Sequence, residues 1–346
     1  MDAVAEAGRS RAGMVVPYLF LGTTMFFWGT AFRATDIGAE HASPVVFSTL
    51  RAVPAAVVLL LIVLATRATL PRGRTLLYSA LSGPLLVTLA FEGIAQGTTL
   101  AGAANAAVLI NTTPFFTLAL GYLFLGERVS RTAALGLPVG FAGAMLMISS
   151  QLGGGVPTGD LMLGMGLALL AGAGFAVGTL LVRAGAMRDG ARFDALGFTA
   201  VQFLVGAPLL VPLMFLYGDP GATDWGSPEL LGSVAWVALG SSALASVTFV
   251  LALRAIPATR ASPWQFLAPV VAVLVELILG DAPGAIALVG MIIAVCGVAI
   301  VSAAPVREER REGTAAGRGP GPGVESGMSG PAADGRALAR ASTERQ

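Results

Sequence analysis

The hydrophobic positions of this chain fall into long apolar runs that are separated by charged or Gly/Pro-rich breaks. A helix needs about 20 predominantly apolar residues to cross the hydrocarbon core of a bilayer. Ten runs fit that length. They are 15–34, 44–66, 75–96, 103–125, 132–150, 160–182, 195–217, 231–253, 262–280 and 284–303. The pattern predicts an all-α integral membrane protein with ten transmembrane helices.

Charges in the breaks alternate in sign along the chain. Short cytoplasmic loops retain arginine and lysine, whereas translocated loops do not. With a cytoplasmic N-terminus, the cytoplasmic breaks hold Arg9, Arg11, Arg67, Arg72, Arg74, Arg128, Arg131, Arg183, Arg188, Arg192, Arg254, Arg260, Arg307, Arg310 and Arg311. The opposite breaks hold Asp36, Glu40, His41, Asp160, Asp219, Asp224, Glu229 and Asp281, and no basic residue. The alternation predicts a multi-pass protein of the plasma (inner) membrane with both termini in the cytoplasm.

The two ends of the chain are predicted to lie outside the membrane. Residues 1–14 are expected to form a cytoplasmic N-terminal segment that is retained, because the apolar run after it is long and lacks a convincing small-x-small cleavage site before Arg33. Residues 304–346 are rich in Gly, Pro, Ala, Arg and Glu. Such a segment cannot bury enough apolar area to offset its ordering entropy, so we expect a disordered cytoplasmic tail.

Composition narrows the classes of function. Of the 346 residues, 55% are hydrophobic and 12% charged, so lipid is the solvent for most of the chain. The net charge of +1 gives no basic field for a nucleic acid. Cys296 and His41 are the only residues of their kinds, which argues against disulfides and Cys/His metal sites. The chain has no lysine, hence no Walker motif, and we expect no cofactor.

The second half of the chain repeats landmarks of the first. Gly126 corresponds to Gly280, and Glu127 to Asp281. The other matches are Pro114 with Pro269, Gly136 with Gly290, Gly143 with Gly297 and, more loosely, Gly29 with Gly172 and Phe32 with Phe175. Each half holds five spans, and an odd number inverts the second half relative to the first. We therefore expect two inverted five-helix repeats, 15–150 and 160–303.

The same motifs resemble those of a known family. The run from Pro114 through LGER, WGTAF at Trp28–Phe32, Arg51 early in the second span and APVVAVL at Ala268–Leu274 are similar to the ten-helix EamA branch of the drug/metabolite transporter superfamily. The resemblance covers about 15–303 and implies membrane export of small metabolites. The chain departs from the family in having LGD in the second copy and Glu276 within the ninth span.

Four charged residues interrupt the predicted spans, namely Arg33, Arg51, Glu92 and Glu276. A charge in the middle of a spanning helix costs about 2.5–3.5 kcal/mol on insertion scales, so each needs a reason. All four fall in the outer half of the bilayer. Opposite charges at similar depth can neutralise one another, which is one interpretation. The other is a polar cavity that binds a charged or zwitterionic solute.

Two glutamines accompany the acids. Gln96 follows Glu92 by one helical turn, and Gln265 is placed by an unbroken helix on the same face as Glu276. A water-lined path explains such a face better than lipid contact, because hydrocarbon offers these groups no partner. The hypothesis is that Glu92 or Glu276 couples transport to protons; for Glu276, snorkelling to the interface is the alternative.

Further candidates lie in the first, fourth and ninth spans. Asn105, Asn111 and Thr112 either contact the solute or join helices by hydrogen bonds. Trp28 stacks on a solute or packs in the core. Pro114 and Pro269, at matched positions, are expected to kink their helices and free carbonyls toward a cavity. Glu127 is expected to be a cap or an ion-pair member.

These features favour a secondary transporter that exports a small amino-acid-like or drug-like solute by alternating access. A flippase for lipids or lipid-linked sugars is the alternative. An integral membrane enzyme fits less well, because His41 lies in an outer loop and the aspartates do not cluster for magnesium. The expected partners are a small-molecule solute and the lipid bilayer, without nucleic acid, and the sequence leaves a homodimer open.

Overall fold

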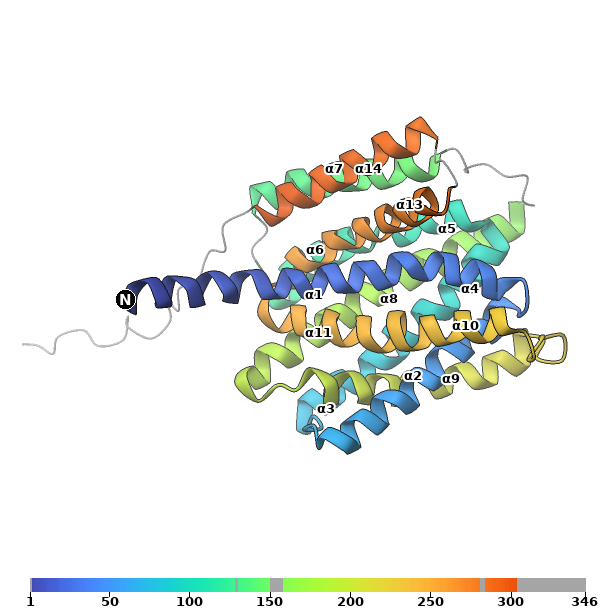
Figure 1. Cartoon of the computed structure of the whole chain (residues 1–346), viewed down its shortest axis with the longest axis horizontal. Helices are drawn as coiled ribbons and strands as arrows, with labels where there is room; N and C mark the ends of the chain where they lie inside the picture. Colours follow the sequence, from blue (N-terminus) through green and yellow to red (C-terminus); the bar gives the residue numbers. More distant parts are fainter. Residues whose placement is uncertain (1, 128–129, 150–157, 281–283, 304–346) are drawn as a thin grey trace, which may run out of the picture. The chain divides into compact units, whose positions relative to one another are not determined.

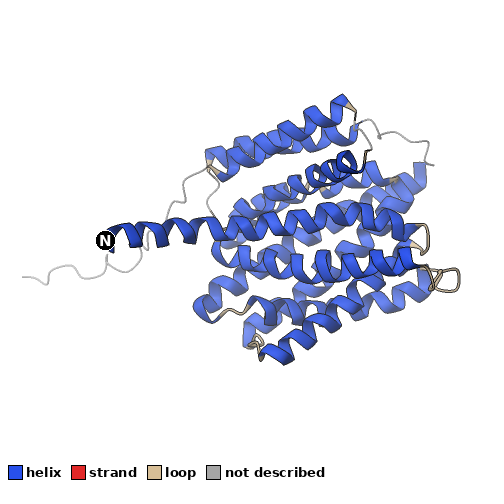
Figure 2. Cartoon of the chain, in the orientation of Figure 1, coloured by secondary structure: helices blue, strands red, loops and turns tan. Residues whose placement is uncertain are grey.

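The computed structural model describes residues 2–127, 130–149, 158–280 and 284–303, and leaves the side chains of 2–14, 103 and 104 undescribed. Over these ranges the regular structure is helical and contains no strand (Figure 2). Ten helical stretches are long and apolar enough to cross a membrane, which confirms the predicted number of spans. The predicted tail 304–346, together with Arg128 and Asp281, lies outside the described residues.

The first half of the chain runs from α1 to α7. Its elements are α1 (Asp2–Ala39), α2 (Pro44–Thr66), α3 (Gly73–Gly83), the π-helical η1 (Pro84–Leu89), α4 (Ala90–Ala101), α5 (Ala103–Ile110), α6 (Thr113–Leu125) and α7 (Arg131–Ile148). The predicted N-terminal segment 1–14 is helical from Asp2 onward as part of α1. The third span, Gly73–Ala101, is longer than the predicted 75–96 because η1 continues the helix into α4.

The second half repeats this order. Its elements are α8 (Thr158–Asp189), the 3-10 helix η3 (Gly190–Arg192), α9 (Ala195–Tyr217), α10 (Pro228–Trp236), the π-helical η4 (Val237–Leu244), α11 (Ala245–Ala255), α12 (Ala258–Ala261), the 3-10 helix η5 (Ser262–Phe266), α13 (Leu267–Leu279) and α14 (Ala285–Ser302).

Contacts between the spans are the same when the halves are exchanged. α1 packs against α11 and α13, and its counterpart α8 packs against α4 and α6. α2 packs against α9, and α7 against α14, so these spans meet their own counterparts (Figure 1). Since each half holds five spans, this exchange symmetry is that of two inverted five-helix repeats.

Irregular backbone also recurs at matched places. The third and eighth spans each contain a π-helical segment, η1 and η4. The fourth span breaks between α5 and α6, and the ninth passes through η5 before α13. Both interrupted spans end at a glycine with positive φ, 63° at Gly126 and 94° at Gly280. A residue with a side chain rarely adopts this conformation, so the LG pairs of the sequence repeat act as helix stops.

α7 and α14 pack through their glycines. A Cβ added at Gly136 would lie 2.7 Å from the Gly297 carbonyl oxygen, and one at Gly290 would lie 2.7 Å from that of Gly143. The exchange of halves maps one contact onto the other. Small residues allow membrane helices to approach until their backbones touch, where dispersion replaces the hydrophobic drive that lipid cannot provide.

The bundle has two chemically different ends. The α2–α3 turn carries the exposed Arg67, Arg72 and Arg74, and the N-terminus lies at the same end (Figure 1). We call this the arginine end. The α1–α2 and α9–α10 loops lie at the other end, with the exposed Glu40 and Asp224, and we call it the acidic end (Figure 1).

Candidate functional site

Arg51 on α2 is half-buried within the membrane-crossing region. Its Nε donates to the Ser242 hydroxyl at 3.2 Å, and its Nη2 donates to the Ser241 hydroxyl at 2.9 Å. The guanidinium carbon lies 4.3 Å from the centre of the Phe91 ring, in a cation–π contact. Within the described residues no carboxylate lies within 4.0 Å of this guanidinium. Hydroxyls and a ring therefore hold the cation, and its charge is not neutralised by an acid.

Ser241 owes its position to the π-helical segment η4. Its carbonyl oxygen accepts a hydrogen bond from Trp28 Nε1 at 3.2 Å, while its hydroxyl accepts from Arg51. π-helical segments are rare and concentrate at functional sites. The first, second and eighth spans are thereby joined at one residue.

Aromatic rings surround Trp28. Phe249 on α11 lies 5.2 Å from it between ring centres, and Phe175 on α8 lies 5.6 Å away in an edge-to-face arrangement. Phe249 is 3% exposed, whereas Trp28 and Phe175 are only partly buried. These two partly buried rings pack against the hydrophobic core and keep some apolar surface accessible, and Trp28 is bonded to Ser241.

Glu92 follows Phe91 directly and lies on α4. Gln96 Nε2 donates to Glu92 Oε1 at 2.9 Å, as the spacing of one turn predicts. The second carboxylate oxygen, Oε2, is buried and has no hydrogen-bond partner among the residues that the structure describes. A buried unsatisfied acceptor is costly, so such a group in a native structure needs an explanation such as a bound ligand, ion or proton.

The neighbours of Glu92 on α4 show which way it faces. Gly93 and Gly97 pack against α8, where an added Cβ on Gly93 would lie 2.8 Å from Ala171 Cβ. Ile94 is exposed on the outer surface, 37% accessible. Helical spacing puts Glu92 and Gln96 on the side of α4 opposite to Ile94.

The fourth span breaks where its polar residues cluster. α5 ends at Ile110, and α6 begins at Thr113 with Pro114 as its second residue. Asn111 Nδ2 bonds the Ala107 carbonyl at 2.8 Å, and the Thr112 hydroxyl donates to the Leu109 carbonyl. Asn105 Nδ2 bonds the Ala101 carbonyl at 2.7 Å. Asn111 and Thr112 thus satisfy carbonyls of their own span, whereas Asn105 satisfies the carbonyl of Ala101, the last residue of the third span.

Two residues of the ninth span that were expected on one face differ in exposure. Gln265 lies in the 3-10 segment η5, where its Nε2 is buried and the described part of the chain offers it no hydrogen-bond partner. Pro269 is the third residue of α13. Glu276, near the end of α13, is exposed. The two side chains thus have different environments, and a water-lined face shared by Gln265 and Glu276 stays a prediction.

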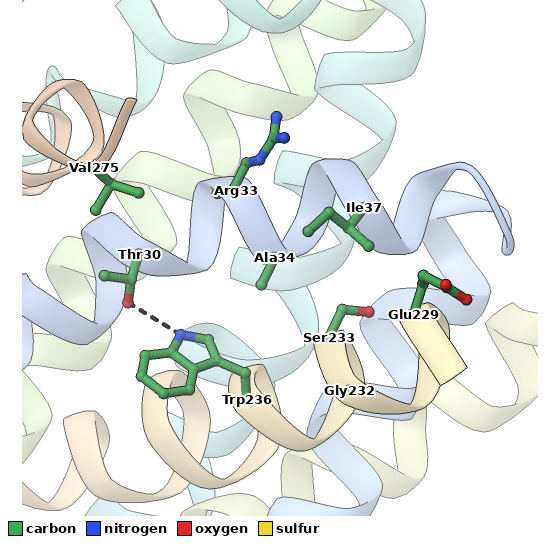
Figure 3. A pocket seen from close by; sticks show the side chains of 9 residues that line it. All are labelled: Thr30, Arg33, Ala34, Ile37, Glu229, Gly232, Ser233, Trp236 and Val275. Atoms are coloured by element: carbon green, nitrogen blue, oxygen red, sulfur yellow. Dashed lines mark hydrogen bonds between the residues drawn. The ribbon is translucent and has the colours of Figure 1, made fainter. Parts of the chain in front are cut away.

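Arg33 lies apart from Arg51, at an open groove between α1, α10 and α13 (Figure 3). The groove encloses about 480 Å³ and is largely apolar. Trp236 Nε1 donates to the Thr30 hydroxyl at 3.1 Å across it. In Figure 3 the exposed Arg33 side chain points away from Trp236, so it borders the groove without reaching into it.

The structure thus joins part of the predicted set. Trp28 and Arg51 meet through Ser241, and Glu92 pairs with Gln96. Within the described residues, no hydrogen bond or ion pair joins Arg33, Gln265 or Glu276 to these groups. Ser241 and Ser242 were missed by the sequence analysis. The one signal for them is a pair of serines in an otherwise apolar span, which is ambiguous because serine in helices often bonds its own backbone.

Comparison with known proteins identifies relatives along the whole membrane-crossing region. The model of the EamA-like transporter family matches residues 16–149 and again residues 162–303. An uncharacterized transporter of Bacillus subtilis, YvbV, is 22% identical over 82% of this chain and 90% of its own. The uncharacterized inner membrane transporter YedA of Escherichia coli is 27% identical over 73% of this chain and 79% of its own.

A third relative carries a more specific description. The probable terminal-alkyne amino-acid exporter of Streptantibioticus cattleyicolor is 26% identical over 85% of this chain and 96% of its own. Among solved structures, one protein superposes with a TM-score of 0.69 over 82% of this chain and 96% of its own, at 18% identity. The structural likeness concerns the fold.

Proposed function

Since the chain belongs to the EamA-like transporter family, we propose that it is a secondary transporter that exports a small amino-acid-like solute by alternating access. Its relatives are transporters, and the chain is a multi-pass membrane protein. The proposal adds the solute class, the direction and the mechanism.

The observation that carries the proposal is that neighbouring spans hold one cation, Arg51, and one carboxylate, Glu92, for which the described residues supply no ion-pair partner. Arg51 stacks on Phe91, and Glu92 is the next residue. Charges inside a membrane protein are expensive and mark solute or ion pathways when no partner neutralises them. A zwitterion would supply both missing partners.

The unused hydrogen-bonding groups fit such a solute. A guanidinium has five N–H donors, and two of those of Arg51 donate to serine hydroxyls. The remaining N–H groups can donate to a carboxylate. The free Oε2 of Glu92 is an acceptor for an ammonium group. The open faces of Trp28 and Phe175 would contact an apolar tail. The amino-acid exporter among the relatives agrees with this class.

Direction and energy source follow from charge placement. The positive-inside rule assigns the arginine end to the cytoplasm of a plasma (inner) membrane protein. Two inverted repeats can then expose a midplane site to either side in turn. Glu92, with one unsatisfied buried oxygen, is the carboxylate suited to carry a proton in exchange for the solute. Glu276 is exposed and less suited.

A lipid or lipid-linked-sugar flippase is the second candidate, and the groove between α1 and α10 favours it. That groove is open to the side and largely apolar, with Glu229 and Ser233 at its polar end (Figure 3). An acyl chain would fit such a surface, and the head group would remain at the acidic end. The Arg51 site is left unexplained by this function.

Flux measurements in proteoliposomes test the proposal. The protein is offered a panel of amino acids, nucleosides, cationic drugs and fluorescent phospholipids, with and without a proton gradient. Flux of zwitterionic amino acids that is lost in Arg51→Gln supports the proposal. Phospholipid exchange without amino-acid flux would establish the flippase, and no flux of any compound by a folded protein would reject both.

A further inference from the structure

Glu127 closes the arginine end of the bundle by an arrangement that the solute site does not use. It follows Gly126, whose positive φ of 63° ends α6, and its side chain is only 4% exposed. Oε1 accepts a hydrogen bond from the Ala258 amide at 2.9 Å, and Oε2 accepts one from the Thr259 amide at 2.9 Å. One carboxylate thus binds the first two amides of α12.

Arg183 on α8 extends this contact to two more spans. Its Nε lies 3.4 Å from Glu127 Oε1. Its Nη1 donates to the carbonyls of Leu253 at 2.9 Å and Arg254 at 3.2 Å, where α11 ends. The carboxylate and the guanidinium therefore link the end of the fourth span to the sixth, eighth and ninth spans.

The neighbouring backbone is shaped for this link. A Cβ added at Gly121 on α6 would lie 2.9 Å from Thr259 Cγ2 and 3.4 Å from Glu127 Oε2. The absence of a side chain at Gly121 allows α6 to approach α12 closely enough for the carboxylate to reach both amides. A side chain in this place would push the two halves of the chain apart.

The link crosses from the first repeat to the second. Glu127 belongs to the first half, and each group it binds belongs to the second. Opening the arginine end requires these halves to separate there. The separation would leave a buried carboxylate and two amides without their hydrogen-bond partners, which costs free energy. The contact therefore opposes any state that is open at this end.

The sequence does not repeat the link at the other end. Asp281 corresponds to Glu127, and Glu40 follows Gly29 at the spacing at which Arg183 follows Gly172. The arginine of one repeat is thus replaced by an acid in the other, and two acids cannot form the same ion pair. A different link does occur at both ends: Asp194 accepts from the Thr69 amide at 2.8 Å, and Ser43 accepts from the Asp219 amide at 3.3 Å.

We propose that Glu127 and Arg183 form an inner latch that sets the resting state of the transporter closed at the arginine end and available to the acidic end. The latch uses an acid and an arginine whose counterparts in the other repeat, by sequence, are the two acids Asp281 and Glu40. Solute binding or protonation must supply the free energy that opens it in each cycle. This inference rests on the proposed alternating access but not on the identity of the solute.

Amide hydrogen exchange of the whole protein in lipid nanodiscs tests the latch without any solute. The Ala258 and Thr259 amides are themselves donors to the carboxylate, so their exchange reports its integrity. In Glu127→Gln we expect exchange over residues 254–262 to rise about tenfold or more. We also expect exchange over 218–227 and 40–46 to fall, because the population shifts toward a state closed at the acidic end.

Ser130→Ala is the matched control. Ser130 caps α7 at the same end and in the same half, but the hydrogen bonds of its hydroxyl within the described residues stay in the first turn of its own helix: it accepts from the Ala133 amide at 3.0 Å and shares a hydrogen bond with the Thr132 hydroxyl at 2.8 Å. We expect faster exchange at the start of α7 and no change at the acidic end. If exchange in Glu127→Gln also changes at the arginine end alone, Glu127 is only a helix cap and the latch is overturned.

If Glu127→Gln does not fold, Arg183→Gln tests the latch instead. It keeps the two amide bonds to Glu127 and removes the cation, so the same opposite changes at the two ends are expected with smaller size. Unchanged exchange at both ends in a folded Arg183→Gln would overturn the proposal. Solute flux is not read in these measurements, so failure of the latch is distinguishable from failure of the proposed transport.

Discussion

Arg51 on the second span donates a hydrogen bond to the Ser241 hydroxyl on the eighth span at 2.9 Å. The same serine accepts from Trp28 of the first span through its carbonyl oxygen. A residue in the π-helical segment of the second repeat thus fixes two groups of the first repeat. This places a cation, an aromatic face and an irregular backbone segment together within the membrane.

Replacing Arg51 by lysine is expected to weaken transport. Lysine keeps the charge but lacks the planar fork that holds two hydroxyls and a carboxylate together. A hydrogen bond to a charged group contributes about 1.5–3 kcal/mol, so we expect KM for flux to rise about 10- to 100-fold. Concentration-dependent uptake into proteoliposomes measures this.

Arg74→Gln serves as the control for Arg51→Lys, because Arg74 is an exposed arginine at the arginine end. Its removal should leave KM unchanged. Equal KM in wild type and Arg51→Lys would show that the guanidinium does not contact the solute.

Much of the fold follows from the sequence because lipid restricts spanning segments to a few structures. The number of helices, the LG stops at Gly126 and Gly280, and the close contact of Gly136 with Gly297 all have local signals. The π-helical segments have no such local signal in the sequence. Their extra residue depends on packing between spans, which a hydropathy pattern does not record.

Glycine packing between α7 and α14 gives a stability prediction. An alanine at Gly290 would place its Cβ 2.7 Å from the Gly143 carbonyl oxygen, so the two backbones must move apart. We expect Gly290→Ala to lower the free energy of unfolding by about 1–3 kcal/mol, the usual cost of overpacking. Thermal unfolding in detergent, followed by size-exclusion chromatography, measures the change.

Gly166→Ala is the matched substitution in α8. A Cβ at Gly166 has no atom within 4 Å, so alanine is expected to be neutral or slightly stabilising. A Gly290→Ala protein as stable as this control would mean that α7 and α14 do not pack as described.

The break in the fourth span gives a prediction about turnover. Pro114 lacks an N–H, so α6 cannot continue the α5 hydrogen-bond ladder at that residue. Alanine would restore a donor for the Ile110 carbonyl and favour one straight helix. We expect Pro114→Ala to reduce kcat for flux several-fold while the protein stays equally or more stable.

Pro138→Ala provides a comparison, because Pro138 lies within the continuous helix α7. It should change stability more than turnover. If Pro114→Ala transports at the wild-type rate, the break between α5 and α6 is not needed for the cycle.

Orientation is predicted from the charges of the loops. Cysteines are placed at Ala222 and Ala191, exposed residues of the acidic and arginine ends, in a Cys296→Ala background. A membrane-impermeant maleimide added to intact cells should label position 222 and not 191. Permeabilised cells should label both. Labelling of 191 alone in intact cells would reverse the assignment of inside and outside.

The candidate site was harder to predict than the fold because its members lie far apart in sequence. Glu92 and Gln96 are close because one helical turn brings them together. Trp28 and Arg51 meet only through Ser241, and no spacing rule connects them. The shared face of Gln265 and Glu276 stays a prediction, because the structure shows only that Gln265 is partly buried and Glu276 exposed.

Proton coupling distinguishes the two acids of the membrane-crossing region. Glu92 has a buried, unpartnered Oε2 beside its bond to Gln96, whereas Glu276 is exposed. A carboxylate carries protons through a transport cycle only if its protonation changes with the state of the site, and burial makes that change large. Glutamine has a similar shape but does not titrate. In Glu92→Gln we therefore expect the ratio of flux with a proton gradient to flux without one to fall to about one.

Glu276→Gln removes a carboxylate of the same type without touching the buried site, and it should keep the wild-type ratio. The ratio is measured with the same solute and vesicles for wild type and both variants, so that differences in expression cancel. If flux remains driven by the proton gradient in Glu92→Gln but not in Glu276→Gln, the exposed Glu276 is the residue that couples transport to protons. Flux that is independent of the gradient in the wild type would mean facilitated transport, and the free Oε2 of Glu92 would then serve only to hold the solute's ammonium group.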